Sequence, residues 1–112
     1  MSEISDDRVV FQQILELIEN DVIAGIYRVD EVIISTAQMA KVYSVSHGTV
    51  GKAINTLVKA DILYKKRGIG MCVADSAREK IIVKRKDVFF NKSIGNLLAE
   101  AKRLDITLDE LI

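Results

Sequence analysis

The sequence has no proline, no tryptophan, one cysteine, one histidine and only 5 % aromatic residues. The single cysteine, Cys72, excludes an intrachain disulfide framework, and the single histidine, His47, excludes a metal site built from several histidines. No apolar run approaches the roughly 20 residues that span a bilayer. The first residues are acidic and contain no hydrophobic signal segment, so we expect a cytoplasmic protein with no membrane partner.

The length of 112 residues is sufficient for one domain and an extension, but not for two independent domains. Hydrophobic residues make up 49 % of the chain and charged residues 29 %, which permits a packed core and argues against general disorder. Because aromatic residues are scarce, this core must consist mainly of isoleucine, valine and leucine.

The formal net charge is zero, but the charges are unevenly distributed. Residues 1–34 contain two basic and eight acidic residues, whereas residues 35–74 contain six basic residues and one acidic residue. Residues 75–112 contain eight basic and seven acidic residues. A basic middle segment is typical of a nucleic-acid contact, although an ordinary solvated face would look the same.

Apolar residues at helical spacing predict a first helix from about Asp7 to Ala24, which Gly25 would terminate. Residues 26–34 then form an irregular or extended connector. The apolar stripe of the first helix comprises Phe11, Ile14, Leu15, Ile18 and Val22.

Two further helices are predicted with a three-residue turn between them. Ser35 and Gln38 have the spacing of a capping box, which begins a short helix that reaches about Val42. Ser46 caps the next helix, which ends near Ala60. Its apolar residues Val50, Ala53, Ile54 and Leu57 leave a polar face of His47, Gly48, Gly51, Lys52, Asn55 and Thr56. This pattern predicts a helix-turn-helix.

Residues 62–66 and 71–74 are two short β-like runs on either side of Arg67, Gly68, Ile69 and Gly70. The glycines permit positive φ angles, so we expect a hairpin with a basic tip. The predicted fold class is mainly α with a small β-hairpin, which is a winged helix-turn-helix followed by a C-terminal helical extension.

Residues 75–112 are predicted to be helical, with capping boxes at Ser76–Glu79 and Thr107–Glu110 and a long helix that reaches about Arg103. We therefore place the winged helix in residues 1–74 and the extension in residues 75–112. The extension carries an apolar stripe that either covers the core of its own chain or packs against a partner. A short tail cannot bury this stripe alone, which favours a two-fold homodimer. The stripe comprises Phe90, Ile94, Leu97, Leu98, Ala101 and Leu104.

Over residues 9–112 the chain resembles the GntR family of bacterial transcription regulators. The similarity lies in the order and spacing of several short motifs rather than in any one of them. Residues 89–107 resemble the small YtrA-like branch, in which two short helices replace the ligand-binding domain and form a dimer. The motifs are residues 33–40, 43–46 and 62–64, Thr49, Val50, Ala53, Leu57, Gly68, Gly70 and Val73, together with Ile18, Glu19, Ile23, Gly25 and Tyr27 upstream.

The chain departs from the family pattern at four positions. Ile34 replaces the usual proline before the capping serine, and Ala37 replaces an arginine. Gly51 replaces the arginine that follows Thr49 and Val50, and Ile69 replaces a basic residue between the wing glycines. Three DNA-contacting charges typical of the family are therefore missing.

The resemblance implies a homodimeric regulator, more often a repressor, that binds double-stranded DNA without chemistry or cofactor. His47, Lys52 and Asn55 are the candidates for base contacts, because Lys52 can donate to guanine and Asn55 can pair with adenine. Nothing combines a nucleophile, a base and an oxyanion site, so we expect neither an enzyme nor a metal site. The predicted DNA contacts are Ser35, Ser46, His47, Gly48, Thr49, Lys52, Asn55, Lys65, Lys66, Arg67 and Gly68.

Two questions stay open at this point. The missing arginines are also consistent with a winged-helix dimer that binds protein instead of DNA. Gly48 and Gly51 either permit close approach to DNA or reflect drift after an arginine contact was lost. With no separate ligand domain, a small-molecule effector, whose identity is unknown, would have to use the dimer interface or the linker.

Overall fold

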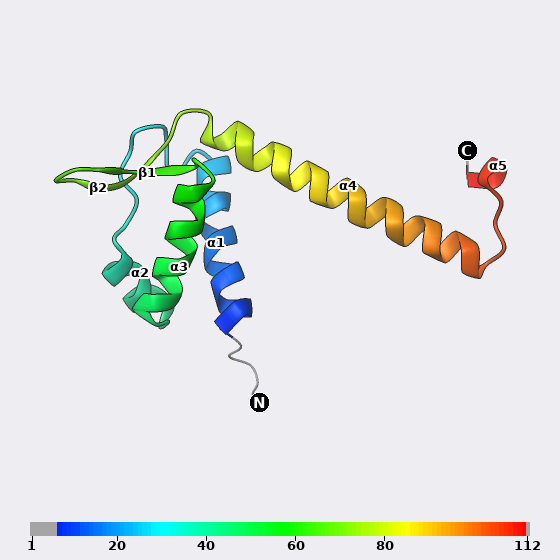
Figure 1. Ribbon diagram of the computed structural model, residues 1–112, viewed down its shortest axis with the longest axis horizontal. Coiled ribbons are helices and arrows are strands. Elements are labelled where there is room, and N and C mark those ends of the chain that lie inside the picture. The colour runs from blue at the N-terminus through cyan, green and yellow to red at the C-terminus, as the bar shows by residue number, and fades with distance from the viewer. Residues whose placement is uncertain (1–6, 112) are drawn as a thin grey trace. The chain divides into compact units, whose positions relative to one another are not determined.

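The computed structural model describes residues 7–111 and confirms the predicted fold class (Figure 1). The described residues are mainly helical, with one antiparallel hairpin between the third and fourth helices. None of these helices is long and apolar enough to cross a membrane. The elements are α1 (Asp7–Ile23), α2 (Thr36–Tyr43), α3 (His47–Lys59), β1 (Leu63–Lys66), β2 (Gly70–Val73), α4 (Ala77–Arg103) and α5 (Leu108–Leu111).

The chain divides into two compact units, one that ends at Ile81 and one that begins at Ile82. The first unit contains α1, α2, α3, the hairpin and the start of α4. The second unit contains the rest of α4 and α5.

The core of the first unit forms where α1 packs against α3. The predicted apolar stripes of both helices are buried, apart from Phe11, which is only partly buried. Met39 and Ala40 of α2 complete one side of the core, and Ile81 of α4 closes it at the boundary of the unit. The largest fully buried side chains are mostly aliphatic or methionine, as the scarcity of aromatic residues requires, but they also include Glu19 and Cys72. The stripe residues in this core are Ile14, Leu15, Ile18, Val22, Val50, Ala53, Ile54 and Leu57.

Two of the three predicted capping boxes are present. The Ser35 hydroxyl accepts a hydrogen bond from Gln38 N–H at 3.1 Å, and the Gln38 side chain accepts one from Ser35 N–H at 3.2 Å. Thr107 and Glu110 form the same reciprocal pair before α5. The backbone hydrogen bond from Thr107 lowers the pKa of Glu110 below its usual value.

The predicted capping box at Ser76–Glu79 is wrong. Ser76 has φ 60°, in the left-handed region, whereas an N-cap residue needs extended backbone before the helix. The helix still begins here, because Lys80 N–H donates to the Ser76 carbonyl at 3.0 Å. Arg78 and Lys80 instead tie the start of α4 to the rest of the first unit, through the carbonyls of Ile23 and Asp61.

The connector between α1 and α2 is more ordered than the sequence predicts. Val32 forms an antiparallel bridge with Cys72, and Val29 forms a parallel bridge with Val73. The connector therefore lies along β2, on the side opposite to β1. Gly70 is required at this contact: its φ is 138°, and a Cβ at this position would lie 3.2 Å from Val32 Cγ2.

Most of the apolar stripe of α4 is exposed within the described chain. Phe90, Ile94, Leu97 and Leu98 of α4, and Leu104 directly after its end, each expose half or more of their surface. Ala101 is the exception, because its side chain is buried. Its carbonyl accepts a hydrogen bond at 2.8 Å from the N–H of Ile106, which lies in the turn after the helix. None of these residues belongs to the buried core cluster of the described residues.

Candidate nucleic-acid interface

The turn between α2 and α3 sets the direction of the predicted recognition helix. Ser44 ends α2 with φ 55°, in the left-handed region, and its N–H bonds back to the last turn of that helix. Ser46 is the N-cap of α3, as predicted, and its hydroxyl accepts a hydrogen bond from Thr49 N–H at 3.1 Å. The two caps hold α2 and α3 in a helix-turn-helix.

Thr49 differs from the other predicted contacts because it is buried, with 8 % of its surface exposed. Its hydroxyl lies 2.8 Å from the Ser46 hydroxyl, and either group can donate in this hydrogen bond. The hydroxyl of this predicted DNA contact is therefore engaged in fixing the start of α3. The backbone at this end of the helix has the partial positive charge that favours an anion.

The remaining predicted contacts of α3 lie on its exposed side. His47, Gly48, Lys52 and Asn55 are exposed, and Gly51 is partly exposed. These residues face away from the buried stripe of the same helix, as the spacing requires. The exposed side of α3 therefore carries the imidazole of His47, the amide of Asn55 and the ammonium of Lys52. Gly48 and Gly51 add no side chain to this face.

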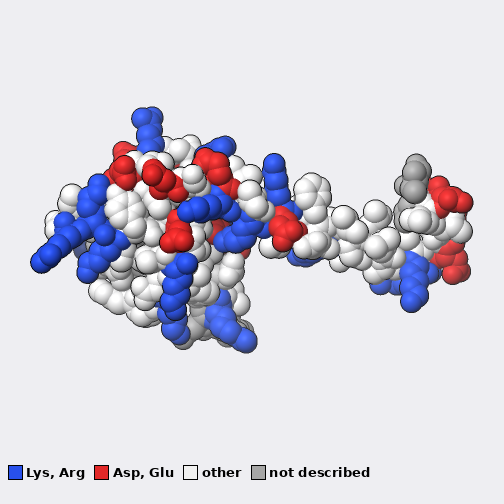
Figure 2. All heavy atoms as spheres, turned by 45° about the horizontal axis from the view of Figure 1, so that its top comes forward, with Lys and Arg blue, Asp and Glu red and all other residues white. Residues whose placement is uncertain are grey.

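The hairpin supplies a second group of cations. Lys65, Arg67 and Gly68 are exposed, while Lys66 is partly buried. The ammonium of Lys66 lies 5.8 Å from the centroid of the Tyr64 ring, within the range of a cation–π contact. Figure 2 shows lysine and arginine side chains gathered at the left end of the view, where Figure 1 places the tip of the hairpin.

Tyr64 links the hairpin to the connector between α1 and α2. Its hydroxyl donates a hydrogen bond to Asp30 Oδ1 at 2.6 Å, and this bond raises the pKa of Tyr64 above its ordinary value. Hydrogen bonding with Tyr64 in turn raises the pKa of Lys66. Both shifts favour the protonated forms, in which Tyr64 donates to Asp30 and Lys66 carries its positive charge in the hairpin.

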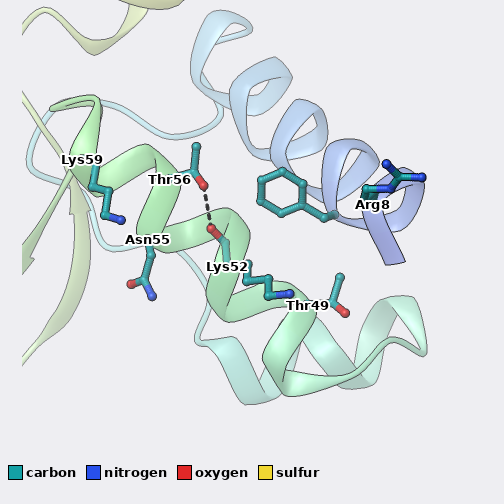
Figure 3. Close-up of a pocket in the computed structure, with 7 residues that line it drawn as sticks. Arg8, Thr49, Lys52, Asn55, Thr56 and Lys59 are labelled. Carbon is teal, nitrogen blue, oxygen red and sulfur yellow. Dashed lines mark hydrogen bonds between the residues drawn. The ribbon is translucent and has the colours of Figure 1, made fainter. Parts of the chain in front are cut away.

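The predicted DNA contacts all lie in the first unit, on three adjacent elements. Ser35 is at the start of α2, the residues from Ser46 to Asn55 are at the start and centre of α3, and residues 65–68 are at the tip of the hairpin. The structure also shows a groove between α1 and α3 that the sequence did not reveal (Figure 3).

Lys59 and Thr56 line this groove beside Lys52 and Asn55. Thr56 already belongs to the predicted polar face, and Lys59 continues that face about two helical turns after Lys52, so the sequence held a signal for both. Arg8 and Phe11 line it from α1. No signal in the sequence identifies these two residues, because the pairing of α1 with α3 is a tertiary contact.

The glycines of α3 give a testable difference between stability and binding. We expect Gly51→Ala to raise the free energy of unfolding by roughly 1 kcal/mol, because alanine favours a helix interior over glycine and an added Cβ meets no atom within 4 Å. Urea denaturation measures this change. Gly25→Ala is the matched control and should lose stability, since Gly25 has φ 80°.

If Gly51→Ala gains stability but binds DNA more weakly, the missing side chain permits close approach of α3 to DNA. Unchanged DNA affinity would instead favour the interpretation that this glycine replaced a lost contact. A loss of stability in Gly51→Ala would contradict the expectation itself.

Comparison with known proteins identifies the family of this unit. The family model described as "Bacterial regulatory proteins, gntR family" matches residues 11–73, which contain most of α1, all of α2 and α3, and the hairpin. None of the curated proteins matches the chain.

Solved structures agree with this match. The chain is similar to a GntR-family transcriptional regulator from Bacteroides thetaiotaomicron, with 29 % identity, a TM-score of 0.74, and coverage of 91 % of this chain and 88 % of that one. A GntR-family transcriptional regulator from Listeria monocytogenes has 19 % identity and a TM-score of 0.68, with coverage of 99 % and 93 %.

A structure of AraR(DBD) in complex with operator ORR3 is also similar, with 31 % identity and a TM-score of 0.55. The similarity covers 57 % of this chain and 77 % of that one. The family model alone matches more than half of the chain, and the fold is that of the DNA-binding transcriptional regulators of this family. The chain therefore belongs to the GntR family of bacterial regulatory proteins.

Proposed function

We propose that this protein is a homodimeric transcriptional repressor that binds a pseudo-palindromic operator. The observation that carries the proposal is the exposed polar face of α3 beside a basic hairpin, in a unit with the GntR fold. Repression would follow from occupancy of an operator that overlaps a promoter, with no chemical step.

In this proposal the N-terminal part of α3 lies in the major groove of DNA. Lys52 donates to the acceptors of guanine, and Asn55 pairs with adenine through its amide. His47, next to the N-cap, contacts a base edge at the start of the helix. The first turns of α2 and α3, which follow Ser35 and Ser46, bind phosphates through the backbone N–H groups that the caps do not use.

The hairpin contributes affinity more than sequence information. Lys65, Lys66 and Arg67 contact the DNA backbone or the minor groove, and the left-handed Gly68 (φ 81°) permits the tight turn at the tip. Lys66 is held in place by Tyr64, so this contact costs less side-chain entropy than that of a free lysine.

The exposed stripe of α4 supports the dimer. Five large apolar side chains there are at least half exposed within the described chain, and a second copy of the same helix is a partner that would cover them. A two-fold dimer places two recognition helices in successive major grooves, roughly 34–36 Å apart.

Selection of bound duplexes from a random DNA library, with the purified full chain at low and moderate salt, tests the proposal. We expect a pseudo-palindrome with half-sites one helical turn apart. Recovery of no sequence above background, from a protein shown to be folded and dimeric, would overturn it and favour a protein-binding module.

The same selection separates the roles of two lysines. We expect Lys52→Ala to change the selected sequence, because this residue is assigned to base edges, and Lys66→Ala to weaken binding to all duplexes to a similar extent. Lys102→Ala, in the last turn of α4, is the control and should behave as the wild type. Identical selection profiles for Lys52→Ala and Lys66→Ala would contradict the two assignments.

A further inference from the structure

The groove between α1 and α3 has a volume of about 410 Å³, which lies within the range of cavities that hold small molecules. It belongs entirely to the first unit, whose core is built by the packing of α1 against α3. From the sequence, a small-molecule effector was expected to bind at the dimer interface or at the linker. The groove is a different place, inside the DNA-binding unit itself.

The side chains that line the groove are suited to an anion. Three of them are cationic, namely Lys52 and Lys59 from α3 and Arg8 from α1. Asn55 of α3 adds an amide that can donate hydrogen bonds, whereas the hydroxyl of Thr49, which also lines the groove, is bonded to that of Ser46. The Thr56 hydroxyl donates to the Lys52 carbonyl at 2.8 Å, which directs it toward its own helix. Among the described residues that line the groove, none is acidic.

Phe11 adds an apolar wall that a simple phosphate contact would not need. Phe11 of α1 lines the groove and is partly buried against the core of the first unit. A flat ring of a ligand can stack on this side chain while its charged group reaches the lysines of α3. A groove with an aromatic wall and a cationic side favours a ligand that has both a flat ring and a negatively charged group.

We propose that the groove binds a small organic anion, in which a carboxylate or phosphate is attached to a flat apolar body. Lys52 and Asn55 line the groove and are also the residues assigned to base contacts. A bound anion would therefore compete with DNA for the same side chains and release the operator. The proposal thus has two steps: binding of the anion to the groove, and competition of the bound anion with DNA. Only the second step, the competition, rests on the proposed function.

Titration of the full chain with phenyl phosphate, followed by amide NMR, tests the first step. Phenyl phosphate carries both the ring and the charge, while inorganic phosphate and benzyl alcohol each carry one of them. We expect saturable shifts near residues 8–11 and 52–59 with phenyl phosphate, and weaker binding of the other two probes. Shifts spread over lysines throughout the chain, or inorganic phosphate binding as tightly as phenyl phosphate, would overturn the proposal.

Variants locate the site. Lys59→Gln should weaken phenyl phosphate about threefold to tenfold, since it removes one charged donor at an exposed position. Lys41→Gln, at an exposed position of α2 outside the groove, is the matched control and should bind as the wild type does. Phe11→Leu should weaken phenyl phosphate while leaving the affinity for inorganic phosphate unchanged. Equal affinity of Lys59→Gln and Lys41→Gln for phenyl phosphate would overturn the assignment to this groove.

A competition experiment at constant ionic strength tests the second step and distinguishes a free ligand from the phosphates of DNA. We expect phenyl phosphate to displace duplex DNA from the wild type, and to do so at higher concentration from Lys59→Gln. Binding of phenyl phosphate without displacement of DNA would overturn the competition. If no duplex binds at all, the proposed function fails, whereas the titration still decides whether the groove binds a flat anion.

Discussion

An increase in salt concentration from 50 to 200 mM is expected to weaken the binding of the dimer to duplex DNA by about 10³–10⁵-fold. This range corresponds to about 6–10 phosphate contacts, whose condensed counterions are released when the protein binds. Each protomer offers Lys52, Lys65, Lys66 and Arg67 at α3 and the hairpin, so that the dimer offers twice this number. We expect a large effect although the net charge of the chain is zero, because residues 35–74, which contain the proposed interface, have six basic residues and only one acidic residue.

Fluorescence anisotropy of a labelled duplex, measured over a salt series at constant pH, gives the slope of log affinity against log salt. Lys65→Gln removes two cations from the dimer and should make this slope less steep by about two. Lys102→Gln removes a cation from the last turn of α4 and should leave the slope unchanged. A nearly flat slope for the wild type would contradict a DNA-binding role for the hairpin.

The helices of the first unit could be predicted because local patterns and tertiary packing agree in them. The stripe of α1 and that of α3 repeat at helical spacing, and both are buried where the two helices meet. The boxes at Ser35 and Thr107 could be predicted for a similar reason, since each involves residues three positions apart. The hairpin followed from two β-like runs around the glycines at 68 and 70.

Elements that depend on contacts distant in the sequence could not be predicted. The connector between α1 and α2 has no strong β pattern, and its bridges at Val29 and Val32 form because β2 offers a free edge. The spacing of Ser76 and Glu79 fits a capping box, but the turn after β2 places Ser76 in the left-handed region. A spacing rule contains no information about the backbone conformation that precedes it.

In the candidate interface too, features set within one helix could be predicted from the sequence, and features set by tertiary contacts could not. Spacing along α3 was sufficient to separate an exposed polar face from a buried one, because both belong to a single helix. Spacing did not reveal that the Thr49 hydroxyl is bonded to Ser46, nor that Arg8 and Phe11 line a groove together with residues of α3. These features depend on how side chains rotate and on which helices pack together.

Leu97→Glu is expected to convert the dimer to a monomer and to lower the affinity for the full operator by about 10²–10⁴-fold, the range over which two linked binding sites exceed one. In a two-fold interface the substitution places a carboxylate from each protomer against an apolar partner, and burial of an unpaired charge is strongly unfavourable. Leu97 is 54 % exposed and lies outside the core of the first unit, so the winged helix should remain folded and bind a single half-site.

Asn96→Glu is the matched control, because Asn96 precedes Leu97 on α4 but lies off the apolar stripe. Sedimentation velocity should show a monomer for Leu97→Glu and a dimer for Asn96→Glu and the wild type. Anisotropy should show that Leu97→Glu binds the full operator little better than a half-site, since its two recognition helices are no longer linked. If Leu97→Glu stays dimeric, the α4 stripe is not the interface; if it is monomeric yet binds the full operator as the wild type does, the α4 dimer is not needed for recognition.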